Sequence, residues 1–264
     1  MTQGPRALSL HNGPVSARDR HKPCVLGIDG CRRGWFAVRL EAHTGWSMEL
    51  LDDDRALGDA VEDVDLALID IPIGLLDGGR EERGCDRAAR RRLGRPRAAS
   101  VFRPPARPAL VAGDYPQANA ANRAATGVGL SRQGFGIAPK IREVDELLCD
   151  RPALRARLRE SHPEVCFQAL NSGRAMDHNK KTAAGRSERR AVLSAHMASA
   201  EAIIESSLAR FRRADVAHDD ILDALVLAAA ADLGTRDPRH LLCLPERPPK
   251  DTRGLAMEIV YAEP

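Results

Sequence analysis

The sequence predicts an α/β fold in which helices flank a mixed sheet, built from a three-stranded antiparallel meander plus parallel strands. Three observations indicate this fold. Short apolar runs separated by glycine-containing turns open the chain after residue 23, as in hairpin-connected strands. A later apolar run reaches Asp70 and is stopped by Pro72, which is typical of a buried strand parallel to the first. Apolar residues at helical spacing near the C-terminus predict covering helices.

The elements of the first part of the chain follow from these runs. The meander is predicted as three strands: residues 24–30, 35–40 and 46–51. The turns between them are expected at residues 30–34 and 43–45. A short helix over 55–63 precedes the buried strand, which we place at 66–71.

Between residues 78 and 159 the pattern is irregular, and we interpret it as a long insertion in a single domain over residues 23–264. Its expected parts are a proline-rich loop at 103–108, a helix near 115–125, a glycine-rich turn near 127–136 and a helix over 141–159. Residues 1–22 are polar, and we predict a disordered N-terminal lead-in there.

After the insertion, residues 164–170 form an apolar run opened by His162-Pro163, and we predict a further strand. Helical spacing predicts one helix over 186–211 and a second over 219–232. A short strand is expected over residues 255–261.

Composition excludes several classes of protein. The chain has 264 residues, of which 43% are apolar and 29% charged, the balance of a soluble globular protein. No apolar run approaches the roughly 20 residues of a membrane-spanning helix, and the N-terminus lacks an apolar signal segment. The six cysteines form no CxxC pair, so a disulfide framework is not expected and the cytoplasm is the expected compartment.

The net charge of +3 is unevenly distributed. Residues 80–107 contain ten arginines against three acidic residues, a local net charge of +7, whereas the rest of the chain carries −4. A dense arginine block favours recognition of phosphate, because the guanidinium group matches its oxygens. The alternative is an arginine-biased composition with the block as a solvated helix face.

Acidic residues stand at three element ends. Asp29 ends the first strand and Asp70 the fourth, while Asp219, Asp220 and Asp223 open the last helix. Carboxylates at neighbouring strand ends repel one another, and Mg²⁺ or Mn²⁺ would relieve that repulsion through oxygen ligands. Two such ions can promote displacement at a phosphodiester. For each residue alone, a turn former or helix N-cap is the alternative.

Motifs from about residue 24 to 262 carry a family resemblance. Gly27-Ile28-Asp29-Gly30, with Gly34-Trp35, and the segment 69–74 resemble the ribonuclease-H-like fold. The chain is more closely similar to the "domain of unknown function 429" family, described as predicted RNase H-like nucleases. The other matching motifs are residues 85–90, 100–107, 129–133, 140–145, 161–167, 180–182 with Gly185, and 219–224.

The resemblance implies roles for particular carboxylates. Asp29 would bridge two divalent ions, Mg²⁺ or Mn²⁺, and Asp70 would bind one of them. Asp220 and Asp223 resemble the acidic pair on the last helix of RuvC-type resolvases. These four are the candidate catalytic residues and metal ligands, and Glu164 is a further candidate metal ligand. Residues 31–33, Cys-Arg-Arg, stand where the family often has a smaller turn, a difference that bears on access to Asp29.

The candidate substrate-binding residues are basic: Arg87, Arg90, Arg103, Arg107, Lys140, His162, Lys180 and Lys181. Lys140 and Glu143 share a helix face, so Lys140 either pairs with a phosphate or forms an ordinary surface pair. Lys180 and Lys181 precede a helix and suit an anion, with a solvated loop as the alternative. His162 and Cys166 lack a completing pair for zinc.

Together these features predict a metal-dependent phosphodiester hydrolase, a nuclease that acts on DNA or RNA by a two-metal-ion mechanism. Its expected partner is nucleic acid or another phosphodiester, with no membrane. One alternative is a non-catalytic protein of the same fold that binds nucleic acid or nucleotide. The other, a phosphotransferase of the actin and sugar-kinase type, requires a duplicated fold unit that a chain with one meander hardly supplies.

Overall fold

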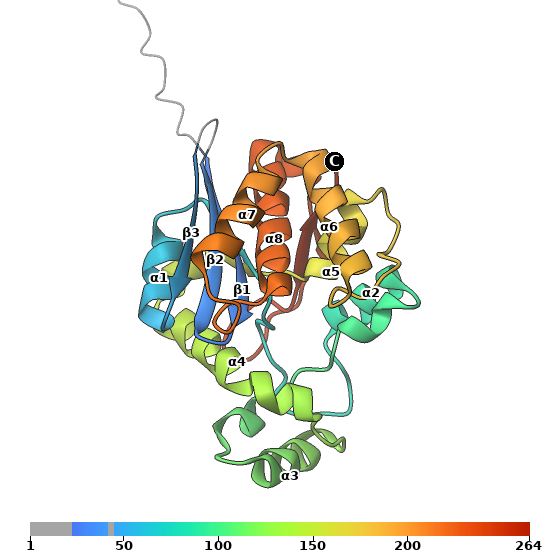
Figure 1. Cartoon of the computed structure of the whole chain (residues 1–264). Coiled ribbons are helices and arrows are strands. Elements are labelled where there is room, and N and C mark those ends of the chain that lie inside the picture. Colours follow the sequence, from blue (N-terminus) through green and yellow to red (C-terminus); the bar gives the residue numbers. More distant parts are fainter. Residues whose placement is uncertain (1–22, 42–44) are drawn as a thin grey trace, which may run out of the picture.

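The three meander strands form where the sequence predicts them, and the central residues of the first two are buried on both faces. The computed structural model describes residues 23–41 and 45–264 (Figure 1). Strand β1 (Cys24–Cys31) pairs antiparallel with β2 (Gly34–Glu41), which pairs antiparallel with β3 (Gly45–Leu51). The predicted lead-in over 1–22 and the turn residues 43 and 44 lie outside the described residues.

Two parallel strands complete the sheet. β4 (Leu66–Ile69) runs parallel to β1, and β5 (Leu158–Glu160) runs parallel to β4. The strand order β3-β2-β1-β4-β5 confirms the predicted mixed sheet flanked by helices. β5 was not predicted, because a three-residue segment carries almost no periodicity. A separate two-stranded sheet pairs β6 (Leu241–Leu244) with β7 (Ile259–Ala262).

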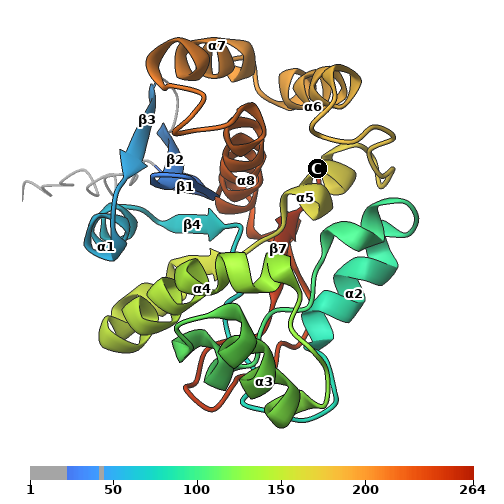
Figure 2. The same ribbon diagram turned by 60° about the horizontal axis from the view of Figure 1, so that its bottom comes forward.

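Helices cover both faces of the five-stranded sheet (Figure 2). One face packs against the last helix and three neighbours: α5 (Pro163–Leu170), α6 (Ala183–His196), α7 (Ala200–Arg210) and α8 (His218–Arg236). The other face packs against α1 (Asp54–Glu62) and α4 (Arg132–Asp150). No helix in the described ranges has the length and apolar character needed to cross a membrane.

The remaining elements lie beside the sheet or connect its parts. They are the helices α2 (Gly84–Leu93) and α3 (Tyr115–Thr126) and the short 3-10 helices η1 (Arg97–Ser100), η2 (Arg107–Val111), η3 (Pro152–Ala156) and η4 (Pro238–His240). Helix α4 lies within the predicted insertion, yet it packs on the sheet through Ile141 and Val144.

The strand predicted over 164–170 is wrong, because the segment is helix α5. A short apolar run does not distinguish a buried strand from a buried helix, and here all eight helical residues are buried. Two local signals favour the helix. The His162 side chain accepts a hydrogen bond from the Glu164 backbone N–H at 3.2 Å, and Pro163 occupies the first helical position.

Other boundaries also differ from the prediction. The helix expected over 186–211 is two helices, α6 and α7, separated at residues 197–199. The predicted glycine-rich turn is shorter than expected, because Ser131 caps α4 by accepting from the Gly134 N–H at 2.9 Å. Helix α4 then ends at Asp150, two residues before Pro152. β4 stops at Ile69 rather than Ile71.

Gly27 allows α8 to approach β1 very closely. A Cβ atom at position 27 would lie 2.1 Å from both the Ala224 carbonyl oxygen and the Ala228 nitrogen. Because these atoms belong to the helix backbone, a side chain could be admitted only by moving α8. The glycine and the facing alanines therefore fix the distance between the helix and the strand.

The variant Gly27→Ala tests this packing. We expect the free energy of unfolding to fall by about 3 kcal/mol or more, since overpacking here meets backbone rather than a flexible side chain. Urea denaturation measures the change. The control is Gly136→Ala in α4, which has no atom within 4 Å of the added Cβ and should gain about 0.5–1 kcal/mol. Equal effects of the two variants would contradict the account.

Candidate functional site

Asp29 and Asp70 reach the same face of the sheet because side chains alternate along a strand. Val25 and Leu68 belong to the core on the face that α8 covers. Asp29 follows Val25 by four positions and Asp70 follows Leu68 by two, so their side chains point to that same face. The Asp70 backbone N–H donates to the Ile28 carbonyl at 3.0 Å, which ties the two strand ends together. The two carboxylates thus meet at the carboxyl ends of parallel strands.

The start of α8 adds two further carboxylates. Asp220 accepts a hydrogen bond from the Ala217 N–H at 2.7 Å, and Asp223, only 1% exposed, lies one turn along the helix. Burial raises the pKa of each to about 6. Repulsion from Asp219 and Asp223 also raises the pKa of Asp220, and repulsion from Asp70 and Glu164 also raises that of Asp223. Burial also raises the pKa of Asp29, and Asp70, Asp223 and Asp220 raise it further. The four predicted carboxylates therefore form one acidic cluster.

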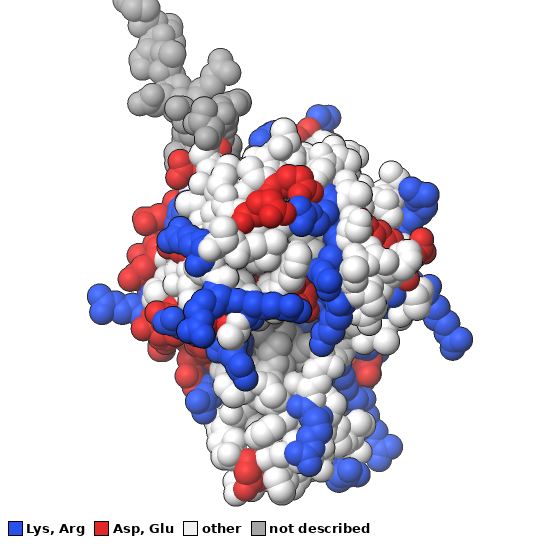
Figure 3. Space-filling view, viewed as in Figure 1, with Lys and Arg blue, Asp and Glu red and all other residues white. Residues whose placement is uncertain are grey.

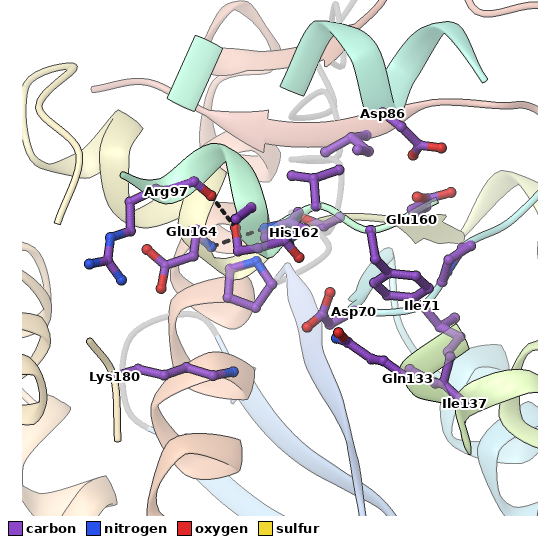
Figure 4. A pocket seen from close by; sticks show the side chains of 18 of the residues that line it. Asp70, Ile71, Asp86, Arg97, Gln133, Ile137, Glu160, His162, Glu164 and Lys180 are labelled. Carbon is purple, nitrogen blue, oxygen red and sulfur yellow. Dashed lines mark hydrogen bonds between the residues drawn. The ribbon is translucent and has the colours of Figure 1, made fainter. Parts of the chain in front are cut away.

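Lys180 extends into this acidic cluster. Its Nζ donates to Asp223 Oδ2 at 2.5 Å. The charges of Asp223 and, more weakly, of Asp29 and Asp70 raise the pKa of the lysine, against the effect of burial. In Figure 4 the Lys180 and Asp70 side chains extend into the same space from opposite sides. The lysine balances part of the negative charge.

A cavity of about 580 Å³ opens beside the acidic cluster (Figure 4). Six of its lining residues were discussed from the sequence as site candidates: Asp70, His162, Glu164, Lys180, Lys181 and Asp219. Others were not foreseen at the site, among them Arg97, Phe102 and Gln133. The cavity thus joins an acidic side to a wall that contains basic and apolar groups.

Glu164 and His162 form the cavity wall at the N-terminus of α5. Arg189, fully buried, donates to Glu164 Oε1, so this carboxylate already has a cationic partner. The His162 Nε2 atom lies 3.4 Å from the Ser100 carbonyl, and its Nδ1 caps α5. Burial raises the pKa of Asp70. The charges of His162 and Lys180 lower this pKa, and the charge of Glu164 raises it.

Two observations test whether these residues fit a divalent cation. Asp223 Oδ1 and Glu164 Oε2 are both buried and have no hydrogen-bond partner, although a buried carboxylate oxygen normally accepts one. Carboxylate oxygens are also the ligands that Mg²⁺ and Mn²⁺ prefer. The donor set therefore suits a hard divalent ion.

A different group has its ligand atoms closer together. In the described ranges, three ligand atoms within 4.8 Å of one another occur at Cys85, Asp86 and Glu160, and not in the acidic cluster. This buried group could hold a metal ion. Arg83, however, donates to Asp86 at 2.7 Å and to Glu160 at 2.6 Å, which balances charge that a cation would otherwise balance. Burial also raises the pKa of the Cys85 thiol, which disfavours a thiolate ligand.

None of the four arginines predicted to bind substrate lines the cavity. Arg107 is buried and pairs with Asp145 at 2.9 Å and with Asp251 at 2.5 Å. Arg90 pairs with Glu82 and donates to the Val101 carbonyl at 2.9 Å. The other two are Arg103, which donates to the Glu81 carbonyl at 2.9 Å, and Arg87, which is exposed on α2.

Lys140 braces the hairpin that carries Asp29. Its Nζ donates to the Gly34 carbonyl at 2.5 Å and lies 4.3 Å from the centre of the Trp35 ring. Glu143 accepts from Trp35 Nε1 at 2.7 Å, so Lys140 and Glu143 share one face of α4 as predicted. Burial lowers the pKa of Lys140.

Sequence reasoning missed the roles of three arginines. Arg83 and Arg189 balance buried carboxylates, and Arg97 lines the cavity. Asp86 lies three positions after Arg83, but the Arg83–Glu160 and Arg189–Glu164 pairs join residues 77 and 25 positions apart, so no local pattern identifies them. Arg97 belongs to the predicted arginine block, but nothing in the sequence distinguishes it from the other nine.

The comparisons with known proteins give one match. Residues 27–249 match the family model described as "Protein of unknown function (DUF429)". This match confirms the family that the motifs resemble. Neither the curated proteins nor the solved structures gave a match.

Asp220→Asn tests the cost of ionising a carboxylate that is partly buried in the acidic cluster and repelled by its neighbours. Because the native pKa of Asp220 is about 6 against an ordinary 3.8, the native state binds the proton more tightly, and stability falls as pH rises from about 4 to 6. Asn keeps the acceptor for Ala217. We expect chemical denaturation to give a gain of about 1–2 kcal/mol at pH 7.5 and almost none at pH 4. An equal gain at both pH values would exclude an ionisation effect.

Arg83→Met tests whether the buried carboxylates of Asp86 and Glu160 need the charge of Arg83 for the fold to be stable. Removing one partner of a buried ion pair leaves the carboxylates of Asp86 and Glu160 without a cation, so we expect a loss of about 3–5 kcal/mol in unfolding free energy. The control Arg87→Met, on the exposed side of α2, should change stability by less than about 0.5 kcal/mol. A loss below about 1 kcal/mol for Arg83→Met would contradict the assignment.

Proposed function

We propose that this chain, which belongs to the DUF429 family, is a metal-dependent phosphodiester hydrolase that acts on nucleic acid. The observation that carries the proposal is the acidic cluster. Asp29, Asp70 and Asp223 are positioned by three different elements, and Asp223 keeps a buried oxygen without a partner. Such buried like charges are costly without a cation, so their convergence supports a metal site.

The candidate metal ligands are Asp29, Asp70 and Asp223, with Asp220 and Glu164 at the edges. When bound there, Mg²⁺ or Mn²⁺ would supply Lewis-acid stabilisation of charge on the phosphodiester oxygens. The chain itself fixes the ligands. The Gly30 N–H donates to Asp29 Oδ1 at 2.8 Å, and the Ala217 N–H orients Asp220. The backbone therefore prepares the orientation of both carboxylates.

Two basic residues that line the cavity offer groups for a phosphate. Arg97 donates to the Asp177 carbonyl at 3.3 Å, and its Nε atom is buried without a partner, so the guanidinium retains unused donors. Lys181 is exposed and also lines the cavity. Figure 3 shows Lys and Arg side chains on both sides of the hollow below the N-terminal end of α8. Contacts of this kind bind a phosphate backbone without reading its sequence.

A specific observation favours the second candidate, a protein that binds nucleic acid without cleaving it. Lys180 already supplies a positive charge to the acidic cluster, so the fold depends less on a metal ion to balance the charge of the carboxylates. The phosphotransferase alternative has less support, because it requires a duplicated unit and the described residues contain one five-stranded sheet.

The first test is cleavage by the purified full-length protein. Single-stranded, duplex, RNA–DNA hybrid and branched nucleic acids are incubated with Mn²⁺ or with EDTA. We expect cleavage only with Mn²⁺, and a loss of about 10³-fold or more in Asp29→Asn, since that change removes a central ligand. The control Asp232→Asn alters the same helix as Asp223 but a residue that pairs with Arg236, and its rate should stay within about twofold.

Two outcomes would change the proposal. Cleavage that survives Asp29→Asn would show that the acidic cluster is not the catalytic site. Binding of nucleic acid without cleavage of any substrate would favour the non-catalytic alternative.

A further inference from the structure

Lys180 is the one described Lys or Arg within ion-pair distance of the acidic cluster. Its Nζ lies 2.5 Å from Asp223 Oδ2, and Asp223 is almost fully buried. Among the described residues, no Lys or Arg forms an ion pair with Asp29, Asp70 or Asp220. Lys180 is thus the one Lys or Arg in the described ranges that is ion-paired with any of these four carboxylates.

The backbone that presents Lys180 is held firmly. The Asn179 carbonyl accepts from the Thr182 N–H at 3.0 Å and from Thr182 Oγ1 at 2.8 Å. Asn179 Oδ1 accepts from the Lys181 N–H at 2.9 Å. Gly185 packs against the same turn, since a Cβ there would lie 2.0 Å from the Asn179 carbonyl oxygen. Movement of the charge therefore depends on the side chain of Lys180, whose four-carbon stem is flexible.

The spacing of the carboxylates agrees with a lysine among them. No three ligand atoms of the described acidic cluster lie within 4.8 Å of one another, as a bound ion would require, and Asp223 Oδ1 still lacks a partner. An ammonium group offers one positive charge and three donors, whereas a divalent ion offers two charges and draws more oxygens together. The wider spacing of the carboxylate oxygens is the one expected when the singly charged ammonium group of Lys180, rather than a divalent ion, lies among them.

We propose that Lys180 is a resident counter-ion of the acidic cluster, which a divalent cation displaces when it binds. This inference rests on the proposed function, since it concerns the same metal site. Before the metal binds, the lysine lowers the repulsion between buried carboxylates and stabilises the fold. Once displaced, its ammonium group turns toward the cavity, whose lining also includes Lys181 and Arg97.

The proposal makes metal affinity depend on the lysine. A cation that must displace a bound ammonium group loses the free energy of that ion pair. Removing the charge should tighten metal binding and, at the same time, destabilise the metal-free protein. A lysine that served only to contact substrate would leave the affinity for metal unchanged.

Mn²⁺ binding tests this dependence without any assay of activity. Free Mn²⁺ is measured by electron paramagnetic resonance in titrations of the wild type, Lys180→Met and Lys181→Met. We expect Lys180→Met to bind about tenfold more tightly or better, a typical size for a coupling between two binding events. Lys181→Met, the adjacent control, should stay within about twofold of the wild type. Thermal unfolding should show a lower midpoint for metal-free Lys180→Met and a larger upward shift with Mn²⁺.

A second measurement uses the unaltered protein, in case Lys180→Met does not fold. The chain has five lysines, so acetylation of each is readily followed by mass spectrometry. Without metal, Lys180 should react much more slowly than Lys181, because it is paired with Asp223. Mn²⁺ should accelerate acetylation of Lys180 and leave Lys181 unchanged.

The outcomes separate this inference from the proposed function. If wild type binds Mn²⁺, but Lys180→Met binds no more tightly and Mn²⁺ does not change Lys180 acetylation, the counter-ion role is wrong and the metal site stands. If neither wild type nor Lys180→Met binds Mn²⁺, both the inference and the metal-dependent function fail. Binding by Lys180→Met alone would support the inference strongly.

Discussion

The close approach of α8 to β1 at Gly27 determines the geometry of the whole site. No side chain fits between the strand and the backbone of Ala224 and Ala228, so the helix lies directly on the strand. Asp29 follows Gly27 by two positions on the same face, and Asp223 precedes Ala224 on the helix. The packing of α8 on β1 that stabilises the core therefore also places the carboxylates of Asp29 and Asp223 near enough to repel each other.

Bringing buried carboxylates together lowers the stability of the fold. Cationic partners offset this loss for some buried carboxylates much more than for others. In the described part of the chain, each buried carboxylate outside the acidic cluster pairs with an arginine: Asp86 and Glu160 with Arg83, Asp145 with Arg107, Glu164 with Arg189, and Glu258 with Arg159. The four carboxylates of the acidic cluster share one lysine, and burial raises the pKa of each. Proteins keep unbalanced buried charges mainly where function requires them. This contrast supports a cation-binding role for the acidic cluster rather than a structural one.

Much of the fold was predictable from local patterns, whereas pairing between distant residues was not. The meander and β4 follow from apolar runs and turns, and the same runs placed Asp29 and Asp70 at the ends of neighbouring strands, as the parallel pairing of β1 with β4 bears out. Helix α5 was mistaken for a strand because a short buried run has no informative period. The arginine block shows a different limit. Arg107, for example, pairs with Asp251, 144 positions away. Part of the positive charge of the arginine block therefore balances carboxylates of the chain itself. The excess of +7 in that block therefore overstates the charge open to a partner.

Two places in the molecule compete as the metal site, the acidic cluster and the group of Cys85, Asp86 and Glu160. A crystal structure of the full chain grown with Mn²⁺, with diffraction data collected at the manganese absorption edge, distinguishes them directly. The account predicts an anomalous peak between Asp29, Asp70 and Asp223, with Lys180 turned away from Asp223. A peak at Cys85 and Glu160, or no peak at saturating Mn²⁺ while Lys180 stays on Asp223, would contradict it.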